Sequence, residues 1–334
     1  MKIIAQAPTR VDFAGGTLDL WPIFNLIDRS QTINAAISIY TQAELTRFAT
    51  PEVVIEIENN GFKKKYKNLE QALADKNTKL DLVKPVLEYF RPNFGFHLKT
   101  SSQSPIGAGL GGSSSLLISI LCVFCEMTET RMTNIELVRL AHNIEAKILK
   151  TPTGTQDYVP PLEGGVNLIH YGFDDLKVEK VFIPQEVFDK HFLLVYTGKP
   201  HHSGFNNWQV LKKAIDGNKK TLKLLSGLRD VSLDLLEKIQ KKDWDFKEIF
   251  KNEYKLRTSV SKSFSSPEIR RLEKIALKNG AQSIKICGAG GGGCVIVWCE
   301  AGQKEKVIQA CQKRGFQILQ AAPVDRGITI SRQS

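Results

Sequence analysis

The chain has 334 residues, of which 42% are hydrophobic, 8% aromatic and 24% charged, a composition typical of soluble globular proteins. This length allows two domains with a full hydrophobic core and excludes collagen-like, disordered and small disulfide-stapled classes. The longest apolar run, 116–125, is much shorter than the ~20 residues that span a bilayer. A formal net charge of +11 favours anionic ligands, nucleic acids or acidic lipids as partners without choosing among them.

The amino terminus has no long apolar core followed by a cleavage site, so it does not read as a signal peptide. Six cysteines lie mostly in apolar stretches, which is typical of free buried thiols in a reducing compartment. We therefore predict a cytoplasmic protein. Cys122 and Cys125 form a C-x-x-C pair inside an apolar helix, and we interpret them as core packing rather than as a metal or redox site.

Hydrophobic periodicity predicts an order of strands and helices along the chain. In the first half we expect strands at 3–13, 31–47, 53–57 and 94–100, then helices at 113–127 and 133–150. In the second half we expect a strand at 192–197, a mainly helical stretch at 205–278, strands at 283–287 and 294–299, a helix near 303–314 and a strand at 316–322. A change of composition near 170–190 divides the chain into domains 1–180 and 181–334. The expected class is α+β, with two lobes and ligands between them.

A loop rich in glycine and serine, 104–115, joins a predicted strand to the apolar helix. Its glycines allow the backbone to approach an anion closely, and the helix N-terminus offers unpaired N–H groups and a partial positive charge. The three serines at 113–115 add hydroxyls for phosphate oxygens or a hydrated Mg²⁺. The loop is therefore predicted to hold phosphate. The alternative, a flexible linker, fits less well because the loop runs directly into a strongly apolar helix.

Other phosphate-binding loops fit the same segment poorly. Gly107, Gly109 and Gly112 satisfy the dinucleotide pattern G-x-G-x-x-G, but 101–105 separates the loop from its strand and no acid-terminated strand follows. A Walker A loop would need a lysine before the hydroxyl residues, and a protein-kinase glycine loop lies in a hairpin. An NAD-linked enzyme is thus the weaker alternative. Binding of ATP with Mg²⁺ but not of NAD would exclude it.

A second glycine loop, 288–293, lies between two apolar strands. Five glycines in six residues exceed the one or two that a hairpin turn needs. Close approach by a ligand or by another backbone explains this better than a mobile surface loop does.

Two acids are candidate functional residues. Glu145 shares a helical stripe with Val138, Ala141 and Ile148, so its carboxylate is expected to point inward. There it needs a metal ion or a cationic partner, and a structural salt bridge is the alternative. Asp157 lies in a Gly/Thr turn, where an aspartate is commonly a turn former.

Three motifs in this order resemble the GHMP small-molecule kinases. They are APTRVDFAGGTLD at 7–19, PIGAGLGGSS at 105–114 and KICGAGGGG at 285–293. The resemblance implies a ribosomal-protein-S5-like N-terminal half that binds the nucleotide and a ferredoxin-like C-terminal half. It also implies an ATP-dependent phosphotransferase that uses Mg²⁺ and acts on an alcohol group.

By this resemblance, Asp157 is the catalytic aspartate and Arg10 its basic partner, while Ser113 and Glu145 bind Mg²⁺. The residues implied in ATP binding are Pro105, Gly107, Gly109, Leu110, Gly111, Gly112, Ser113, Ser114 and Ser115. The residues expected near the substrate are Asp19, Gly16, Thr17, Gly288, Gly290 and His201.

Two positions depart from the family motifs. Gly112 stands where the family often has the first serine, so Ser113 or Ser114 must take the metal role. Cys287 replaces a usual serine. The first motif and the segment 155–167 look most like heptose-7-phosphate kinases and their fucose-kinase relatives, whereas the Gly-Glu-His signature of mevalonate kinases is absent.

The resemblance thus implies a kinase for a sugar or sugar phosphate, carbohydrate metabolism in the cytoplasm, and a monomer or homodimer. A non-sugar acceptor such as mevalonate or homoserine is one alternative. A catalytically inactive, ligand-sensing homologue is another, and an ATP turnover assay would discriminate it. We expect no nucleic-acid or membrane partner, because no basic cluster interleaved with aromatics is present.

Overall fold

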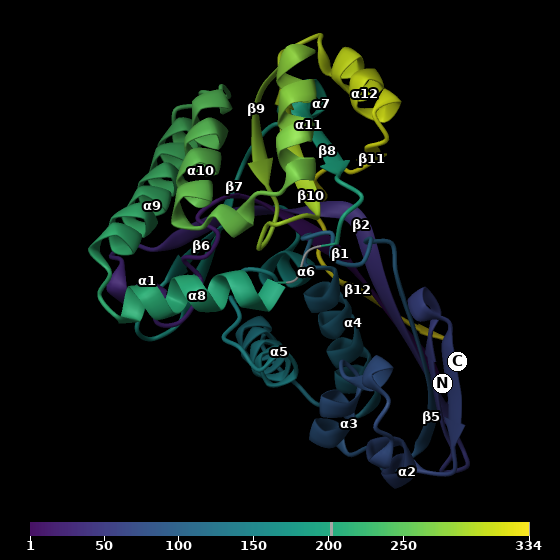
Figure 1. The fold of residues 1–334 in the computed structure, drawn as a ribbon. Coiled ribbons are helices and arrows are strands. Elements are labelled where there is room, and N and C mark those ends of the chain that lie inside the picture. Colours follow the sequence, from purple (N-terminus) through teal and green to yellow (C-terminus); the bar gives the residue numbers. More distant parts are fainter. Residues whose placement is uncertain (201–202, 334) are drawn as a thin grey trace.

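The computed structural model in Figure 1 describes residues 1–200 and 203–333. Within these residues the strands form an eight-stranded and a four-stranded sheet. The strands of the larger sheet are β1 (Lys2–Ala14), β2 (Gln31–Phe48), β3 (Val53–Ile57), β4 (Phe62–Tyr66), β5 (Gly95–Ser102), β6 (Val166–Tyr171), β7 (Leu176–Val181) and β12 (Thr329–Gln333). The smaller sheet contains β8 (Phe192–Tyr196), β9 (Ala281–Ile286), β10 (Cys294–Cys299) and β11 (Gln317–Leu319).

The helices cover both sheets. In the first half they are α1 (Ile23–Leu26), α2 (Leu69–Ala74), α3 (Lys84–Phe90), α4 (Gly112–Met127), α5 (Asn134–Leu149) and α6 (Val159–Glu163). In the second half they are α7 (Gln185–His191), α8 (Ser203–Ile215), α9 (Lys219–Gln240), α10 (Lys247–Val260), α11 (Pro267–Lys278) and α12 (Lys304–Lys313). Short 3₁₀ turns lie at Glu58–Asn60, Thr78–Leu80 and Lys262–Phe264.

The larger sheet is organised around β2, which is 18 residues long. Its first residues pair with β6, its last residues pair with β5, and β1 lies antiparallel to nearly its whole length. Helix α4 packs on β1 and β2 and is almost fully buried. This explains why α4 is apolar on all sides: a helix between a sheet and other helices has no solvent face.

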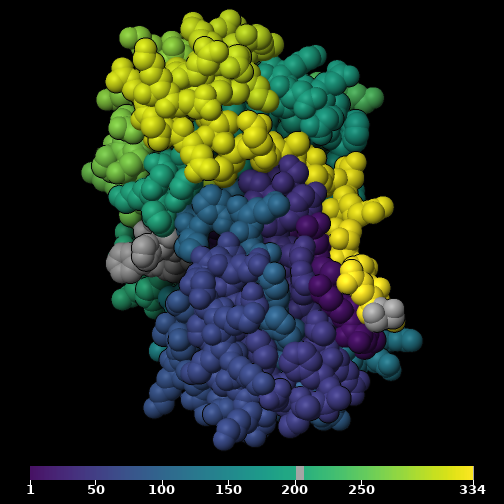
Figure 2. Space-filling model, turned by 90° about the vertical axis from the view of Figure 1, so that its right-hand side faces the viewer, coloured from purple at the N-terminus to yellow at the C-terminus, as the bar shows by residue number. Residues whose placement is uncertain are grey.

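The two lobes share a hydrophobic core. Phe13 of β1 stacks on Phe188 at 5.9 Å between ring centroids, and Phe250 of α10 meets Trp298 of β10 at 5.3 Å. Strand β12 also returns to the first sheet and pairs with β1, and Figure 2 shows the last residues running beside the N-terminal strand. The lobes are therefore held together by side-chain packing and by the returning chain.

The α+β class and most of the predicted elements are confirmed. The helix predicted at 133–150 is α5, which begins with a capping box of Thr133 and Glu136. The predicted strand at 316–322 is shorter, as β11 covers three residues. The division into 1–180 and 181–334 stays a prediction. Its boundary falls at the end of β7, and the return of β12 to the larger sheet places one C-terminal segment with the first lobe. Among the described residues, no helix combines the length and apolarity needed to cross a bilayer.

Candidate active site

The predicted phosphate loop connects β5 to α4. Its backbone carbonyls accept hydrogen bonds from neighbouring segments of the protein. The Cys294 amide donates to Ala108 O at 2.7 Å, while the Arg10 side chain donates to Gly109 O at 2.6 Å and the Arg10 amide donates to Leu110 O at 2.9 Å. Helix α4 begins without a side-chain cap, so its first-turn N–H groups remain for an anion. Gly111 precedes α4 with φ +66°, a conformation that glycine adopts at little cost.

The second glycine loop packs against the first. A Cβ on Gly288 would lie 3.0 Å from the Gly109 backbone, and one on Gly293 would lie 2.7 Å from Ala108 O. The glycines are therefore explained by close approach of two backbones. Gly288 lines the cavity described below. Gly290 is not among the cavity-lining residues, and a Cβ on it would lie 2.5 Å from Phe264 O, so its place near the substrate stays a prediction.

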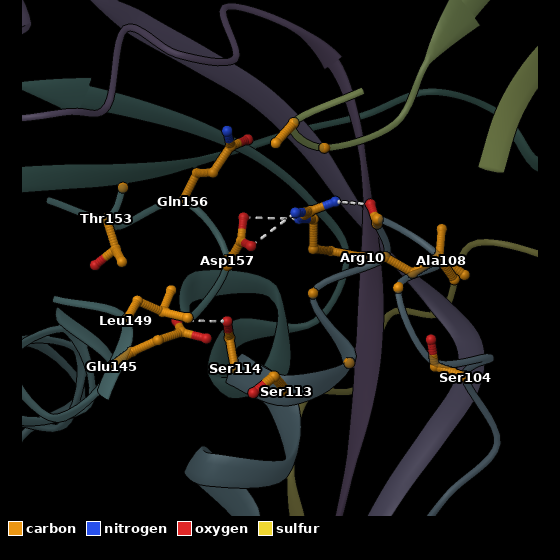
Figure 3. Close-up of a pocket in the computed structure, with 18 of the residues that line it drawn as sticks. Arg10, Ser104, Ala108, Ser113, Ser114, Glu145, Leu149, Thr153, Gln156 and Asp157 are labelled. Atoms are coloured by element: carbon orange, nitrogen blue, oxygen red, sulfur yellow. Dashed lines mark hydrogen bonds and ion pairs between the residues drawn. The ribbon is translucent and has the colours of Figure 1, made fainter. Parts of the chain in front are cut away.

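Arg10 of β1 and Asp157 meet at the cavity wall. Arg10 donates from Nε to Asp157 Oδ1 at 2.9 Å and from Nη2 to Oδ2 at 2.7 Å, a bidentate pair (Figure 3). Burial opposes the charge of Arg10, but the carboxylates of Asp157 and Asp12 outweigh it and raise the pKa of Arg10. Arg10 is 3% exposed and Asp157 28%, so the pair holds an accessible carboxylate in a fixed orientation.

Glu145 of α5 lies across from the start of α4. It accepts hydrogen bonds from Ser114 Oγ at 3.0 Å (Figure 3) and from the Tyr158 hydroxyl, and Ser113 is a further hydrogen-bond partner. Burial raises the pKa of Glu145, a shift that the Tyr158 hydrogen bond partly opposes. In the described chain its partners are hydroxyls rather than a lysine or arginine, so the salt-bridge alternative is not realised.

These groups line a single cavity of about 450 Å³, which is the size of a small-molecule site. One end is apolar and contains Ile57, Leu82 and Leu116. The glycine loop and the start of α4 also line the cavity. The other end is polar, and its lining includes Gly16, Thr17, Asp19, Gln156 and Arg257.

Asp19 is buried in the polar end. Its carboxylate accepts a hydrogen bond from the backbone amide of Gln156 at 3.2 Å. It also lies so close to Gly154 that a Cβ there would come within 1.7 Å of Asp19 Oδ2. Burial, reinforced by the charge of Asp157, raises the pKa of Asp19 from 3.8 to about 6. The protein therefore keeps a poorly solvated carboxylate where a substrate hydroxyl could donate to it.

This carboxylate predicts an unusual pH dependence of stability. The folded-state pKa of Asp19 is raised, so folding favours its protonated form and stability falls as pH rises from about 4 through 6. We expect Asp19→Asn to increase the free energy of unfolding at pH 7.5 by as much as ~3 kcal/mol, with the gain lost below pH 4. Urea unfolding of both proteins across this pH range is the measurement. A gain that is independent of pH would contradict the assignment.

Ser115 requires a correction. Its hydroxyl donates to Pro8 O at 2.9 Å and contacts Thr41 Oγ1 at 2.8 Å, so it faces β1 and β2 instead of the cavity. The other predicted ATP-binding residues, 105, 107 and 109–114, all line the cavity, and Ala108, which was not predicted, lines it too. His201 lies outside the described residues.

The Ser115 contacts lead to a contrast between neighbours. We expect Ser115→Ala to lower the free energy of unfolding by ~1 kcal/mol, because the buried carbonyl of Pro8 loses its hydrogen-bond donor. The KM for ATP should not change. Ser114→Ala should instead impair turnover. Thermal unfolding and initial rates of both variants test this, and a raised ATP KM for Ser115→Ala alone would contradict it.

Sequence reasoning missed several groups at this site. Arg257 of α10 bonds Glu253 at 2.6 Å and donates weakly to Gly16 O and Thr17 Oγ1. Lys285 pairs with Asp12, and Tyr158 holds Glu145. A local signal for Arg257 was available, because a glutamate four residues earlier in a helix favours an ion pair, but nothing local links that pair to the first motif.

The comparisons with known proteins agree with this geometry. "GHMP kinases N terminal domain" matches residues 81–165 and "GHMP kinases C terminal" matches residues 246–317. D-glycero-alpha-D-manno-heptose 7-phosphate kinase of Campylobacter jejuni is 26% identical over 329 residues, covering 94% of each chain. Mevalonate kinase of Methanocaldococcus jannaschii is 26% identical over 257 residues, covering 71% of this chain and 72% of its own.

Solved structures share the fold along the whole chain. A D-glycero-D-manno-heptose 1-phosphate kinase from Bacteriodes thetaiotaomicron superposes with a TM-score of 0.80 at 21% identity, covering 99% of both chains. Galactokinase of Lactococcus lactis gives 0.79 at 18% identity, covering 98% of this chain and 95% of its own.

Two lobes around a glycine-rich phosphate loop define the architecture of a small-molecule kinase. The chain contains both the N-terminal and the C-terminal domain of the GHMP kinases. It is thus an ATP-dependent phosphotransferase that acts on a hydroxyl group.

Proposed function

We propose that this protein transfers the γ-phosphoryl group of ATP to a hydroxyl of a sugar or sugar phosphate. The observation that carries the proposal is the bidentate Arg10–Asp157 pair, which lies on the same cavity wall as the uncapped start of α4. The similarity to a heptose 7-phosphate kinase over 94% of both chains supports a sugar acceptor.

The cavity suits both substrates. The apolar end at Ile57, Leu82 and Leu116 can hold the adenine ring, and the glycine loop can wrap the phosphates. Three residues that line the cavity carry buried oxygens without a protein partner in the described chain: Gln156 Oε1, Thr151 Oγ1 and Asn207 Oδ1. Unpaired acceptors of this kind favour a polyhydroxylated ligand, which brings several donors.

The residues near Glu145 fit Mg²⁺. A carboxylate beside Ser113 and Ser114, together with substrate phosphates, is the oxygen-rich donor set that this ion prefers. When bound there, Mg²⁺ would neutralise charge on the phosphates. In the described residues no group of three or more His, Cys, Asp or Glu side chains forms a cation cage, so the nucleotide itself would supply the remaining oxygens.

The protein's own groups would position the acceptor. Asp157, held by Arg10, would take or orient the proton of the attacking hydroxyl. Asp19 would accept a hydrogen bond from another hydroxyl. Phosphoryl transfer depends on such alignment and charge neutralisation more than on covalent catalysis.

We place this reaction in the cytoplasm, because all six cysteines are free and mostly buried. Burial raises the pKa of Cys287 to about 12, so the thiol that replaces the family's serine stays protonated. It therefore adds no charge beside the glycine loop.

The proposal is tested with a panel of acceptors and ADP release as the readout. Heptose 7-phosphate, heptose 1-phosphate, free heptose, fucose, galactose, mevalonate and homoserine form the panel. We expect a sugar or sugar phosphate to give the highest kcat/KM. Preference for mevalonate or homoserine would overturn the sugar assignment, and absence of turnover with every acceptor would favour a ligand-sensing homologue.

A further inference from the structure

Asp12 is a second carboxylate beside Arg10, and it joins the two lobes. It lies on β1 and is 1% exposed. Its Oδ2 pairs with Lys285 Nζ of β9, and its Oδ1 accepts the Gly288 amide at 3.2 Å. Oδ1 also lies 3.8 Å from Arg10 Nη1. Asp12 therefore contacts the second glycine loop and lies beside the arginine that holds Asp157.

Arg10 thus has two carboxylates within reach. Two nitrogens of the Arg10 guanidinium donate hydrogen bonds to Asp157. The third nitrogen is only within ion-pair distance of Asp12. An arginine prefers the carboxylate that offers bidentate geometry, but a buried carboxylate without its own cation would compete strongly for it. Lys285, which is fully buried, supplies that cation to Asp12.

We propose that Lys285 is a positioning residue: by pairing with Asp12 it leaves Arg10 free to hold Asp157 in its catalytic orientation. Lys285 does not line the cavity and acts through two other side chains. The effect that Lys285 has on turnover rests on the proposed function. The effect that it has on the orientation of the Arg10 side chain does not.

The test compares Lys285→Met with the double variant Asp12→Asn/Lys285→Met. In a crystal structure of Lys285→Met we expect Arg10 to turn from Asp157 to Asp12. We also expect kcat to fall at least ~10-fold with the KM for ATP within ~3-fold. The double variant removes the competing charge, so Arg10 should return to Asp157 and most of the lost kcat should be recovered.

The controls separate positioning from stability. Lys304→Met removes a partly buried lysine that bonds two backbone carbonyls and does not line the cavity, and it should not move Arg10. A merely structural ion pair would make Asp12→Asn and Lys285→Met equally harmful to kcat per folded molecule. The proposal instead requires Lys285→Met to be the more harmful. If Lys285→Met fails to fold, Lys285→Gln keeps a hydrogen bond to Asp12 while removing the charge.

Two results would overturn the proposal. One is a Lys285→Met or Lys285→Gln structure in which Arg10 stays bidentate on Asp157 while Asp12 turns to Arg257, whose guanidinium also borders Gly16 beside Asp12. The other is a double variant that is no better than the single one. A wild-type enzyme inert toward every acceptor would refute the proposed function, yet the crystallographic comparison would still decide the role of Lys285.

Discussion

Asp157→Asn is expected to lower kcat by ~10²–10⁴-fold while the affinity for ATP stays within a few-fold of the wild type. The introduced amide would keep the shape of the side chain and could still accept from Arg10, but it has no negative charge to attract the hydroxyl proton. The glycine loop that is expected to bind the nucleotide and this carboxylate lie on different segments of the cavity wall. Initial rates of ADP release and equilibrium binding of a fluorescent ATP analogue measure the two effects.

A matched control is Asp175→Asn. Asp175 pairs with Arg139 at 2.5 Å, so it is also an arginine-bound aspartate of the first lobe, but it does not line the cavity. This variant should turn over at the wild-type rate. Wild-type turnover in Asp157→Asn itself would remove Asp157 from the reaction.

Glu145→Gln should lower kcat by ~10²-fold or more and raise the Mg²⁺ concentration needed for half-maximal rate. Glutamine can keep the hydrogen bonds of Ser114 and Tyr158 but lacks the charge that a divalent ion needs, and such an ion contributes several kcal/mol to charge stabilisation. Rates measured across a Mg²⁺ titration are the test, with removal of Mg²⁺ by chelation as the zero point.

Glu179→Gln serves as the control for this titration, since Glu179 is 65% exposed on β7 and outside the cavity. Its Mg²⁺ dependence should match that of the wild type. An unchanged Mg²⁺ requirement in Glu145→Gln would show that Glu145 is a structural hydrogen-bond acceptor for Tyr158.

Local patterns predicted the elements that carry the site. The apolar stripe of α5 indicated that Glu145 points inward, and the glycine loop followed by an apolar helix indicated the anion site. Both signals lie within about 15 residues of sequence. The strands β6 and β7 escaped prediction although, at six residues each, they are longer than β3, which was predicted. Their hairpin joins the sheet only through β2.

Long-range pairs could not be predicted in the same way. Arg257 meets Thr17, and Lys285 meets Asp12, across 240 and 273 positions of sequence, so no local pattern connects them. The error at Ser115 was avoidable. Successive helical residues are ~100° apart, so three consecutive serines cannot all face one cavity, and the third faces the sheet.

A crystal structure with Mg²⁺ and a non-hydrolysable ATP analogue would examine phosphate placement directly. We predict that the β- and γ-phosphates lie at the first turn of α4, with the ion contacting Glu145 and a serine at 113 or 114, and with the γ-phosphate facing Asp157. A nucleotide bound outside this cavity, or a γ-phosphate directed away from Asp157, would contradict the account.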